Sequence, residues 1–165
     1  MQEWTATDAD WSNDIPVPFG KGVIITSGEA DTTLTFAGQV VSEALTFEVK
    51  GGNGITWTGN TTPADLKLGD FAIPTDQNFL SGDSLTLAIY NESGSLDGEY
   101  SFVDEKNAAG YGLTKTGWYP LEKMQEWTAT DADCANETVP IPAGKMVVIT
   151  SGEADTTLTL PSPLE

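Results

Sequence analysis

The stretch MQEWTATDAD at residues 1–10 recurs, residue for residue, at residues 124–133. Each copy runs on through a Pro-x-Pro segment and a short apolar run into ITSGEADTTLT, at residues 25–35 and again at residues 149–159. Only the middle differs, WSNDIPVPFGKGVI against CANETVPIPAGKMVV, with one additional residue in the second copy. Self-similarity at a fixed spacing is typical of repeat proteins. We therefore take this duplicated segment as the feature around which the chain is organised.

Each copy of the duplicated segment is predicted to end in a β-hairpin. In the second copy, a short apolar run and a polar turn precede residues 156–160, whose alternation places Leu158 and Leu160 on one face. The first copy has Leu34 and Phe36 at the matching positions. Two short strands joined by a tight polar turn are the usual pattern of a hairpin.

The region between the two copies also contains short runs in which apolar and polar residues alternate. This period of two is typical of a strand that buries one face. No segment keeps a helical period for three turns, and helix is expected only as one or two turns near residues 64–69. We therefore predict an all-β fold, an antiparallel sandwich or flattened barrel of short strands with at most one or two helical turns. The side chains expected in its core are those of Leu45, Phe47, Val49, Leu85, Leu87 and Ile89.

The chain is strongly acidic. Seven lysines and no arginine face 25 carboxylates, for a formal net charge of -18. This charge repels nucleic acid and anionic membrane surfaces, so neither is an expected partner. No apolar run reaches the roughly 18 residues that would suggest a membrane-spanning helix.

The sequence has no histidine and a single cysteine, Cys134. This excludes His-based acid–base catalysis, His-containing triads and the usual zinc sites. Two acids across a cleft could form a glycosidase pair, but no loop looks long enough to build a deep cleft. We therefore expect no enzymatic activity. Cys134 aligns with Trp11 of the first copy and is predicted to be a structural or half-exposed thiol.

Several short motifs give the chain a resemblance to a known class of modules. They are AGQV at residues 37–40, GNTTP at 59–63 with LKLGDF after it, LAIYNESGSLDGEYSF at 87–102, GW at 117–118 and PAGK at 142–145. In these motifs the chain resembles the tandem β-rich repeat modules of unassigned function in large secreted or surface-associated bacterial proteins. The resemblance implies a secreted or cell-surface location in a bacterium, and neighbouring repeats of the same protein as partners.

In that family a module opens after an AGQV-like segment and closes with an apolar strand. The resemblance thus implies a complete β module at residues 40–163, preceded at residues 1–38 by the tail hairpin of another repeat, a near-duplicate of residues 124–161. Residues 164–165 are attributed to a cloning remnant. A leftover hairpin exposes strand edges and an apolar face, so we expect the first copy to pack on the main module. The alternative is that it completes a neighbouring molecule in a strand-swapped homo-oligomer.

Tryptophans are the first candidates for ligand binding, because indole faces stack on sugar rings. Trp4 and Trp127 occupy identical polar contexts in the two copies, which favours a surface ring. Trp57 and Trp118 are interpreted mainly as core residues, and Trp118 is kept as a further ligand-binding candidate.

Acidic loops in both copies are candidate calcium sites, since calcium takes about six to eight oxygen ligands, often from alternating Asp and Asn. The loops lack the glycine and the closing glutamate of an EF-hand, so the same acids can equally be turn residues that accept backbone N–H bonds. No other cofactor is expected. The candidate ligands are Asp8, Asp10 and Asp14 in the first copy and Asp131 and Asp133 in the second.

These features favour a non-catalytic extracellular repeat module that acts as a structural or adhesive spacer or display unit of a long bacterial surface protein. The alternative function is a carbohydrate-binding module that uses exposed tryptophans and is stabilised by calcium, with glycans as its partners.

Overall fold

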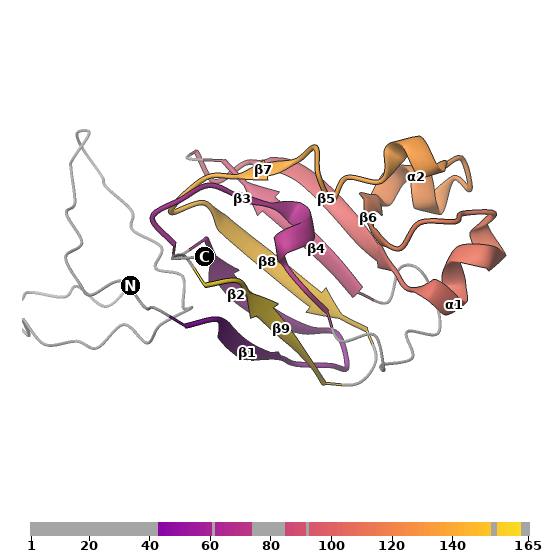
Figure 1. The fold of residues 1–165 in the computed structure, drawn as a ribbon. Coiled ribbons are helices and arrows are strands. Elements are labelled where there is room, and N and C mark those ends of the chain that lie inside the picture. The colour runs from indigo at the N-terminus through magenta and orange to yellow at the C-terminus, as the bar shows by residue number, and fades with distance from the viewer. Residues whose placement is uncertain (1–42, 61, 74–84, 92, 153–154, 163–165) are drawn as a thin grey trace, which may run out of the picture.

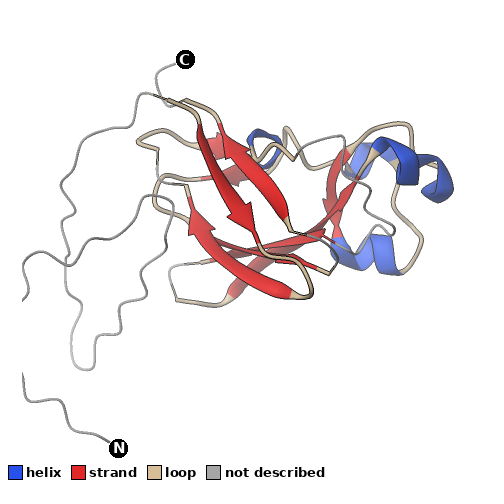
Figure 2. Cartoon of the chain, turned by 90° about the horizontal axis from the view of Figure 1, so that it is seen from below, coloured by secondary structure: helices blue, strands red, loops and turns tan. Residues whose placement is uncertain are grey.

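The computed structural model describes residues 43–60, 62–73, 85–91, 93–152 and 155–162. In this part of the chain, two layers of antiparallel strands pack face to face, and short helices gather at one end of the molecule (Figures 1 and 2). The predicted all-β antiparallel sandwich is therefore confirmed.

The larger layer is a five-stranded sheet with the order β2-β8-β4-β5-β6. Its strands are β2 (Gly54–Gly59), β4 (Leu85–Tyr90), β5 (Leu96–Val103), β6 (Gly117–Pro120) and β8 (Met146–Ser151). Strands β4 and β5 form an antiparallel hairpin. Strand β8, although late in the chain, lies between β2 and β4 and is hydrogen-bonded to both.

The smaller layer consists of two pairs of strands. In one pair, β1 (Leu45–Val49) runs antiparallel to β9 (Thr156–Leu160). In the other, β3 (Leu66–Lys67) runs antiparallel to β7 (Pro140–Ile141). A single bridge from Ala72 to the β9 backbone joins the two pairs.

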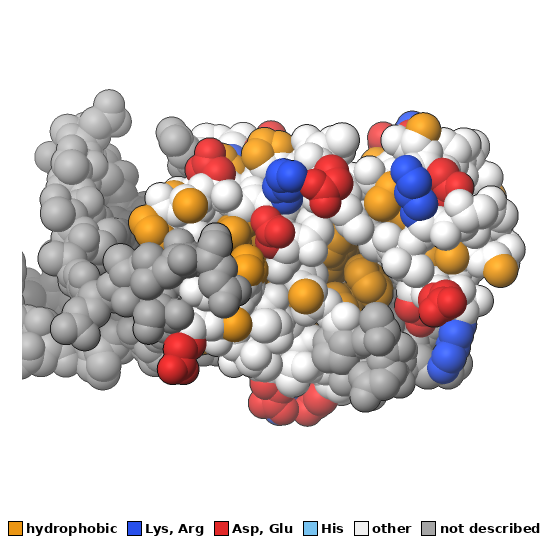
Figure 3. Space-filling model, in the orientation of Figure 1, with side chains coloured by type: hydrophobic (Ala, Val, Ile, Leu, Met, Phe, Trp, Pro, Cys, Tyr) orange, Lys and Arg blue, Asp and Glu red, His pale blue; other side chains and the backbone are white. Residues whose placement is uncertain are grey.

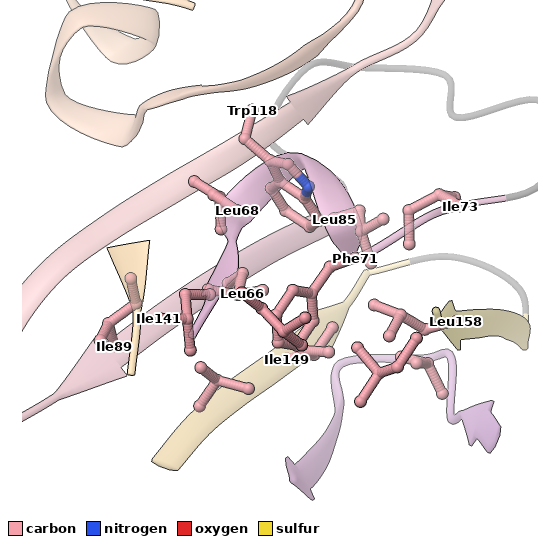
Figure 4. Close-up of a cluster of buried hydrophobic side chains, with 14 of the residues drawn as sticks. Leu66, Leu68, Phe71, Ile73, Leu85, Ile89, Trp118, Ile141, Ile149 and Leu158 are labelled. Atoms are coloured by element: carbon pink, nitrogen blue, oxygen red, sulfur yellow. The ribbon is translucent and has the colours of Figure 1, made fainter. Parts of the chain in front are cut away.

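The two layers bury one main hydrophobic core between them (Figure 4). The core positions predicted from the alternation are confirmed: Val49 and the three predicted residues of β4 are buried, while Leu45 and Phe47 are half-buried against them. Burial of each large aliphatic side chain stabilises the fold by about 2 kcal/mol. The largest fully buried side chains include Trp118, Phe71, Leu68, Leu85, Leu87, Ile141, Ile149, Leu158 and Leu160.

The predicted hairpin of the second copy is wrong, because β8 and β9 lie in different layers. Strand β8 is hydrogen-bonded along both edges, by β2 and by β4, so no edge remains for β9, which pairs with β1 instead. The segment is therefore an arch: its two strands face each other across the core instead of lying side by side. An arch and a hairpin need the same apolar alternation and the same polar turn, so the sequence pattern does not distinguish them.

Strands β1 and β2 form a second arch that stacks on the first. The two arches are tied together at their turns by the carboxylate of Asp155, which accepts the Gly51 N–H at 2.8 Å and forms an ion pair with Lys50 at 3.1 Å. The Asn53 N–H also donates to the Ser151 carbonyl at 2.8 Å. These contacts fix which turn lies over which.

The prediction that Trp57 belongs to the core is also wrong. Trp57 and its neighbour Ile55 are 42% and 59% exposed, whereas Thr56 and Thr58 point inward and are buried. A period of two fixes which side chains share a face, but it does not fix which face meets the core.

Helical turns are more numerous than the sequence predicts. Near residues 64–69, where helix was expected, the structure has a 3-10 turn at Leu68–Asp70. Further turns form α1 (Glu105–Ala108) and α2 (Leu121–Gln125), and a 3-10 turn follows at Asp131–Asp133. They cover a second, smaller core at the β5–β6 side of the sheet, made by Val103, Ala108, Leu113, Tyr119 and Met124.

The GNTTP motif owes its structure to one buried asparagine. Asn60 is 1% exposed, and its amide donates to the carbonyls of Ala64 and Ile141, both at 2.7 Å. Its side-chain oxygen accepts both the N–H and the hydroxyl of Thr62. The side chain thereby joins the loop after β2 to strand β7 in the opposite layer.

Replacing Asn60 with alanine should destabilise the protein by about 3 kcal/mol, because the buried Ile141 carbonyl loses its amide donor and the buried Thr62 N–H loses its acceptor. Asn91→Ala is the matched control: the Asn91 side chain also accepts the N–H groups of a loop, but from Ser93 and Ser95 at the surface. This control should lose only about 1 kcal/mol. Urea denaturation measures both, and equal losses for the two variants would contradict the assigned role of Asn60.

Candidate functional site

Helices α1 and α2 and the 3-10 turns beside them form a helical cap at one end of the sandwich, and the second copy of MQEWTATDAD supplies the last part of this cap (Figures 1 and 2). It begins within α2, passes Trp127 and ends in the 3-10 turn that contains both candidate calcium ligands of this copy. The candidate site therefore comprises Trp127, Asp131 and Asp133.

Trp127 occupies an unusual backbone position at the end of α2. Its N–H donates to the Met124 carbonyl and the next N–H, of Thr128, donates to the Lys123 carbonyl, which is the Schellman pattern of a helix end. In this motif the residue after the helix has a left-handed backbone conformation. Trp127 occupies that position, with a φ angle of 58°. Glycine is the usual residue here, because a left-handed conformation costs other residues about 1–2 kcal/mol.

The indole of Trp127 is displayed and not buried. The residue is 72% exposed, and its ring lies against that of Tyr111 with centroids 4.8 Å apart and planes tilted by 32°. This confirms the surface position predicted for Trp127. A bulky residue held in a strained conformation with its ring in solvent is a feature typical of binding sites.

The carboxylate of Asp131 anchors a loop. One oxygen accepts the N–H of Thr114 at 2.8 Å and that of Lys115 at 3.2 Å, and the other accepts the Thr114 hydroxyl. These bonds stabilise the charged form, so the pKa of Asp131 lies below its ordinary value, with the Thr114 hydroxyl as the largest cause.

The carboxylate of Asp133 closes its own turn and pairs with α2. It accepts a charged hydrogen bond from Lys123, and the N–H and hydroxyl of Thr130 at 2.9 and 2.8 Å. Lys123 and then Thr130 lower the pKa of Asp133 to about 2. The cap is thus held together by the two acids that the sequence offers as calcium ligands.

In the described part of the chain, no group of three or more His, Cys, Asp or Glu side chains lies close enough to share a metal ion. Both candidates in the second copy have the geometry of turn residues, the alternative that the sequence left open. Asp8, Asp10 and Asp14 lie outside the described residues, as does Trp4. Calcium binding stays a prediction.

Trp118 lies in the main core and is 1% exposed, with its ring edge-on to Phe102 at a centroid distance of 5.2 Å. A ligand cannot stack on it in this structure, which leaves Trp127 as the exposed member of the candidate set among the described residues. The residues around each tryptophan distinguish the buried ring from the exposed one in the sequence. Trp118 follows a strand glycine, whereas Trp127 stands in a run of polar residues.

The surface beside the cap carries a depression of about 740 Å³. Residues Thr114, Lys115, Asp131, Cys134 and Asn136 belong to its lining. Cys134 is partly buried, as predicted. On the face shown in Figure 3, charged side chains of both signs lie in small groups instead of one large patch. Among the described residues, ion pairs join Lys50 with Glu48 and Asp155, Lys67 with Glu137, Lys123 with Asp133, and Lys145 with Asp97.

Three asparagines stand in N-x-S/T sequences, and the side chain of each holds a loop. Asn60 is buried as described above, and Asn91 accepts two N–H groups and a hydroxyl of its own turn. Asn136 accepts the Trp118 N–H at 2.9 Å and donates to the Thr116 carbonyl at 3.3 Å. Local turn structure therefore accounts for the N-x-S/T pattern at Asn60 and Asn91, whereas Asn136 links its loop to a segment distant in the sequence.

Comparison of the chain with protein-family models, with curated proteins and with solved structures finds no match. Among the residues that the structure describes, no helix is sufficiently long and apolar to cross a membrane.

Acid should weaken the cap through Asp133. Its pKa is lower in the folded protein than its ordinary value of 3.8, so its contribution to stability is present above that value and is lost as the pH falls towards about 2. The parent protein should therefore lose more urea resistance across this interval than Asp133→Asn, which has no proton to take up. Glu126→Gln, an exposed change on the same cap, should behave as the parent. Equal acid sensitivity of Asp133→Asn and the parent would contradict this role.

Proposed function

We propose that this chain is a non-catalytic display module of a long, repeat-containing bacterial surface protein. The observation that supports it is the register of β1 and β9, in which Leu45, at the start of the described module, stands directly opposite Leu160, at its end. The polypeptide therefore enters and leaves the sandwich at the same place.

The helical cap lies at the other end of the molecule. In Figure 1 the first residues of β1 and the last residues of β9 are at the left, whereas α1 and α2 are at the right. A module of this shape projects sideways from the chain that carries it. Its outermost part is then the cap, with the exposed ring of Trp127 lying against the partly buried Tyr111.

The same register argues against a load-bearing spacer. Hydrogen bonds between antiparallel strands run perpendicular to the strands. A force that separates the adjacent residues Leu45 and Leu160 acts along these bonds and loads them one after another, so that the pair peels. A force applied to opposite ends of the pair would load all the bonds together.

The sequence supports the remaining parts of the proposal. Its duplicated segment and the resemblance to tandem bacterial modules favour neighbouring repeats as partners, with residues 1–38 as the tail of one repeat and residues 40–163 as the next. The charge of -18 favours solubility and disfavours association with nucleic acid. The module needs no catalytic group for this role.

Pulling single molecules tests the display role. In a Cys134→Ser background of the full chain, cysteines at positions 44 and 162 serve as attachment points for the pulling handles. Force applied between these two positions peels β1 from β9. The matched variant carries its handles at positions 44 and 157 and shears the same pair, because Thr157 lies near the opposite end. We expect a clearly lower unfolding force for the 44/162 variant. An equal or higher force would support a load-bearing spacer.

A second function, carbohydrate binding, is favoured by one observation: the Trp127 indole is exposed and stacked on Tyr111 despite an unfavourable backbone angle. Sugar rings stack on such faces. The acidity of the chain favours a neutral glycan over an anionic one.

If the cap binds neutral glycans, titration with soluble oligomers of glucose or N-acetylglucosamine should change the tryptophan emission of the parent. It should leave Trp127→Gly unchanged. Glycine suits the left-handed position, so this variant keeps the helix end while removing the indole. Trp57→Thr, which removes an exposed indole elsewhere, is the control. An identical response of the parent and Trp127→Gly would place any binding away from the cap.

A further inference from the structure

The second copy closes the sandwich by filling one position in each layer. Strand β8 lies between β2 and β4, and β9 supplies the strand partner of β1. We call the gap between β2 and β4, together with the facing edge of β1, the closing slot. The side chains that β8 and β9 place in the closing slot are those of Val147, Ile149, Ser151, Thr156, Leu158 and Leu160, all buried.

The first copy carries the same inward pattern. Residues 22–36 align with residues 146–160 without a gap, and the turn sequence between the two runs is identical. The inward positions agree except for the last, where phenylalanine replaces leucine. The corresponding residues of the first copy are Val23, Ile25, Ser27, Thr32, Leu34 and Phe36.

The correspondence continues upstream of these strands. Asn136 accepts the N–H of Trp118, and Pro140–Ile141 pairs with β3. The first copy offers Asn13 and, at residues 16–17, Pro-Val in the same order. It therefore has the groups for most contacts that the second copy makes with the rest of the sandwich.

The chain connection permits the first copy to use the closing slot. In the structure, Leu160 at the end of β9 stands opposite Leu45 at the start of β1. A strand in the place of β9 that ended at Phe36 would lie beside Leu45, with residues 37–44 between them. A connection of this length joins two antiparallel neighbours without strain.

We propose that residues 22–36 bind the closing slot of their own chain as an alternative to residues 146–160. The two closed forms have the same sandwich and differ in chain order, as circular permutants do. Whichever copy occupies the closing slot, the other is released. This inference concerns how the fold closes, and it stands independently of the display role.

The second copy is the better occupant, in agreement with the structure. Ile141 is fully buried, and the first copy has the smaller Val17 in its place. Met146 begins β8, whereas the first copy has Gly22, and glycine weakens a strand. The first copy therefore takes the closing slot mainly when the second is impaired.

The first experiment impairs each copy in turn within the full chain. Ile149→Asp places a charge in the closing slot and should release the second copy, while Ile25→Asp is the matched change in the first copy. We expect Ile149→Asp to remain a monomer with a cooperative urea transition. Cys134, partly buried in the structure, should then react with a thiol reagent as fast as in urea. Ile25→Asp should keep the slow thiol reaction of the parent.

The double variant should have no cooperative transition, because neither copy can close the fold. The proposal is overturned if Ile149→Asp alone is as unfolded as the double variant. It is also overturned if Ile149→Asp folds only as a dimer, since the occupant would then come from a second copy of the chain.

A second experiment traps the alternative form in the otherwise unaltered full chain. Thr46 and Thr159 face each other across β1 and β9 with hydroxyl oxygens 2.9 Å apart. In a Cys134→Ser background, cysteines at 46 and 159 should form a disulfide within one chain. Thr35 corresponds to Thr159, so cysteines at 46 and 35 should also form one, more slowly, when the first copy visits the closing slot.

Cysteines at 46 and 33 are the register control. Thr33 corresponds to Thr157, which stands opposite Glu48 and not opposite position 46. A disulfide needs closely spaced Cβ atoms, so this variant should stay reduced under the same oxidation. If the 46/35 and 46/33 variants oxidise to the same extent, the first copy does not bind in register and the proposal fails.

Discussion

The structure depends on the stacking of two arches, each of which places one strand on either side of one core. The arch of β1 and β2 and the arch of β8 and β9 each contribute one strand to either layer, so both layers are assembled by the same pair of segments. The inward side chains of these strands, among them Val49, Ile149 and Leu158, then bury one another. The Asp155 carboxylate at the turns fixes their alignment. The hairpin of β4 and β5 and the helical cap extend the sheet that this arrangement creates.

The sequence predicts the strands and most of the core because burial of one face imposes a period of two. It does not predict which strands share a layer, since a period of two is equally compatible with a hairpin and an arch. Strand pairing in the folded protein determines which strands share a layer. Because β8 is hydrogen-bonded along both edges, β9 lies in the other layer. Trp57 shows the same limit, because its exposure depends on which face of β2 meets the second layer, and the inward face carries Thr56 and Thr58 instead.

The sequence predicts which residues belong to the candidate site, but it does not predict their backbone conformation or their hydrogen-bond partners. The polar context of Trp127 indicates a surface ring, but the left-handed backbone that presents it is a position where glycine is expected. The sequence identifies the acids as either metal ligands or turn residues. In the structure Asp131 and Asp133 accept hydrogen bonds from backbone N–H groups, as turn residues do, and calcium binding stays a prediction. Asp131 binds the loop at Thr114, a partner distant in the sequence, whereas Asp133 binds Thr130 in its own turn. Only the second of these contacts follows a local pattern, the capping box.

The duplicated segment is not itself a module of this fold. In the second copy it supplies the last part of the cap, the short strand β7 and the closing arch, while the remaining strands come from residues 43–123. Because Leu45 and Leu160 are neighbours, the same contacts can form whether this segment precedes or follows the rest of the sandwich. Loop closure does not discriminate strongly between the two orders, since doubling a loop costs only about 0.6 kcal/mol. The choice between the copies therefore rests on small differences in packing, such as phenylalanine against leucine at the end of β9, where a change of shape costs about 1–3 kcal/mol. A chain that carries its closing segment twice is thus held in one order by a few side chains.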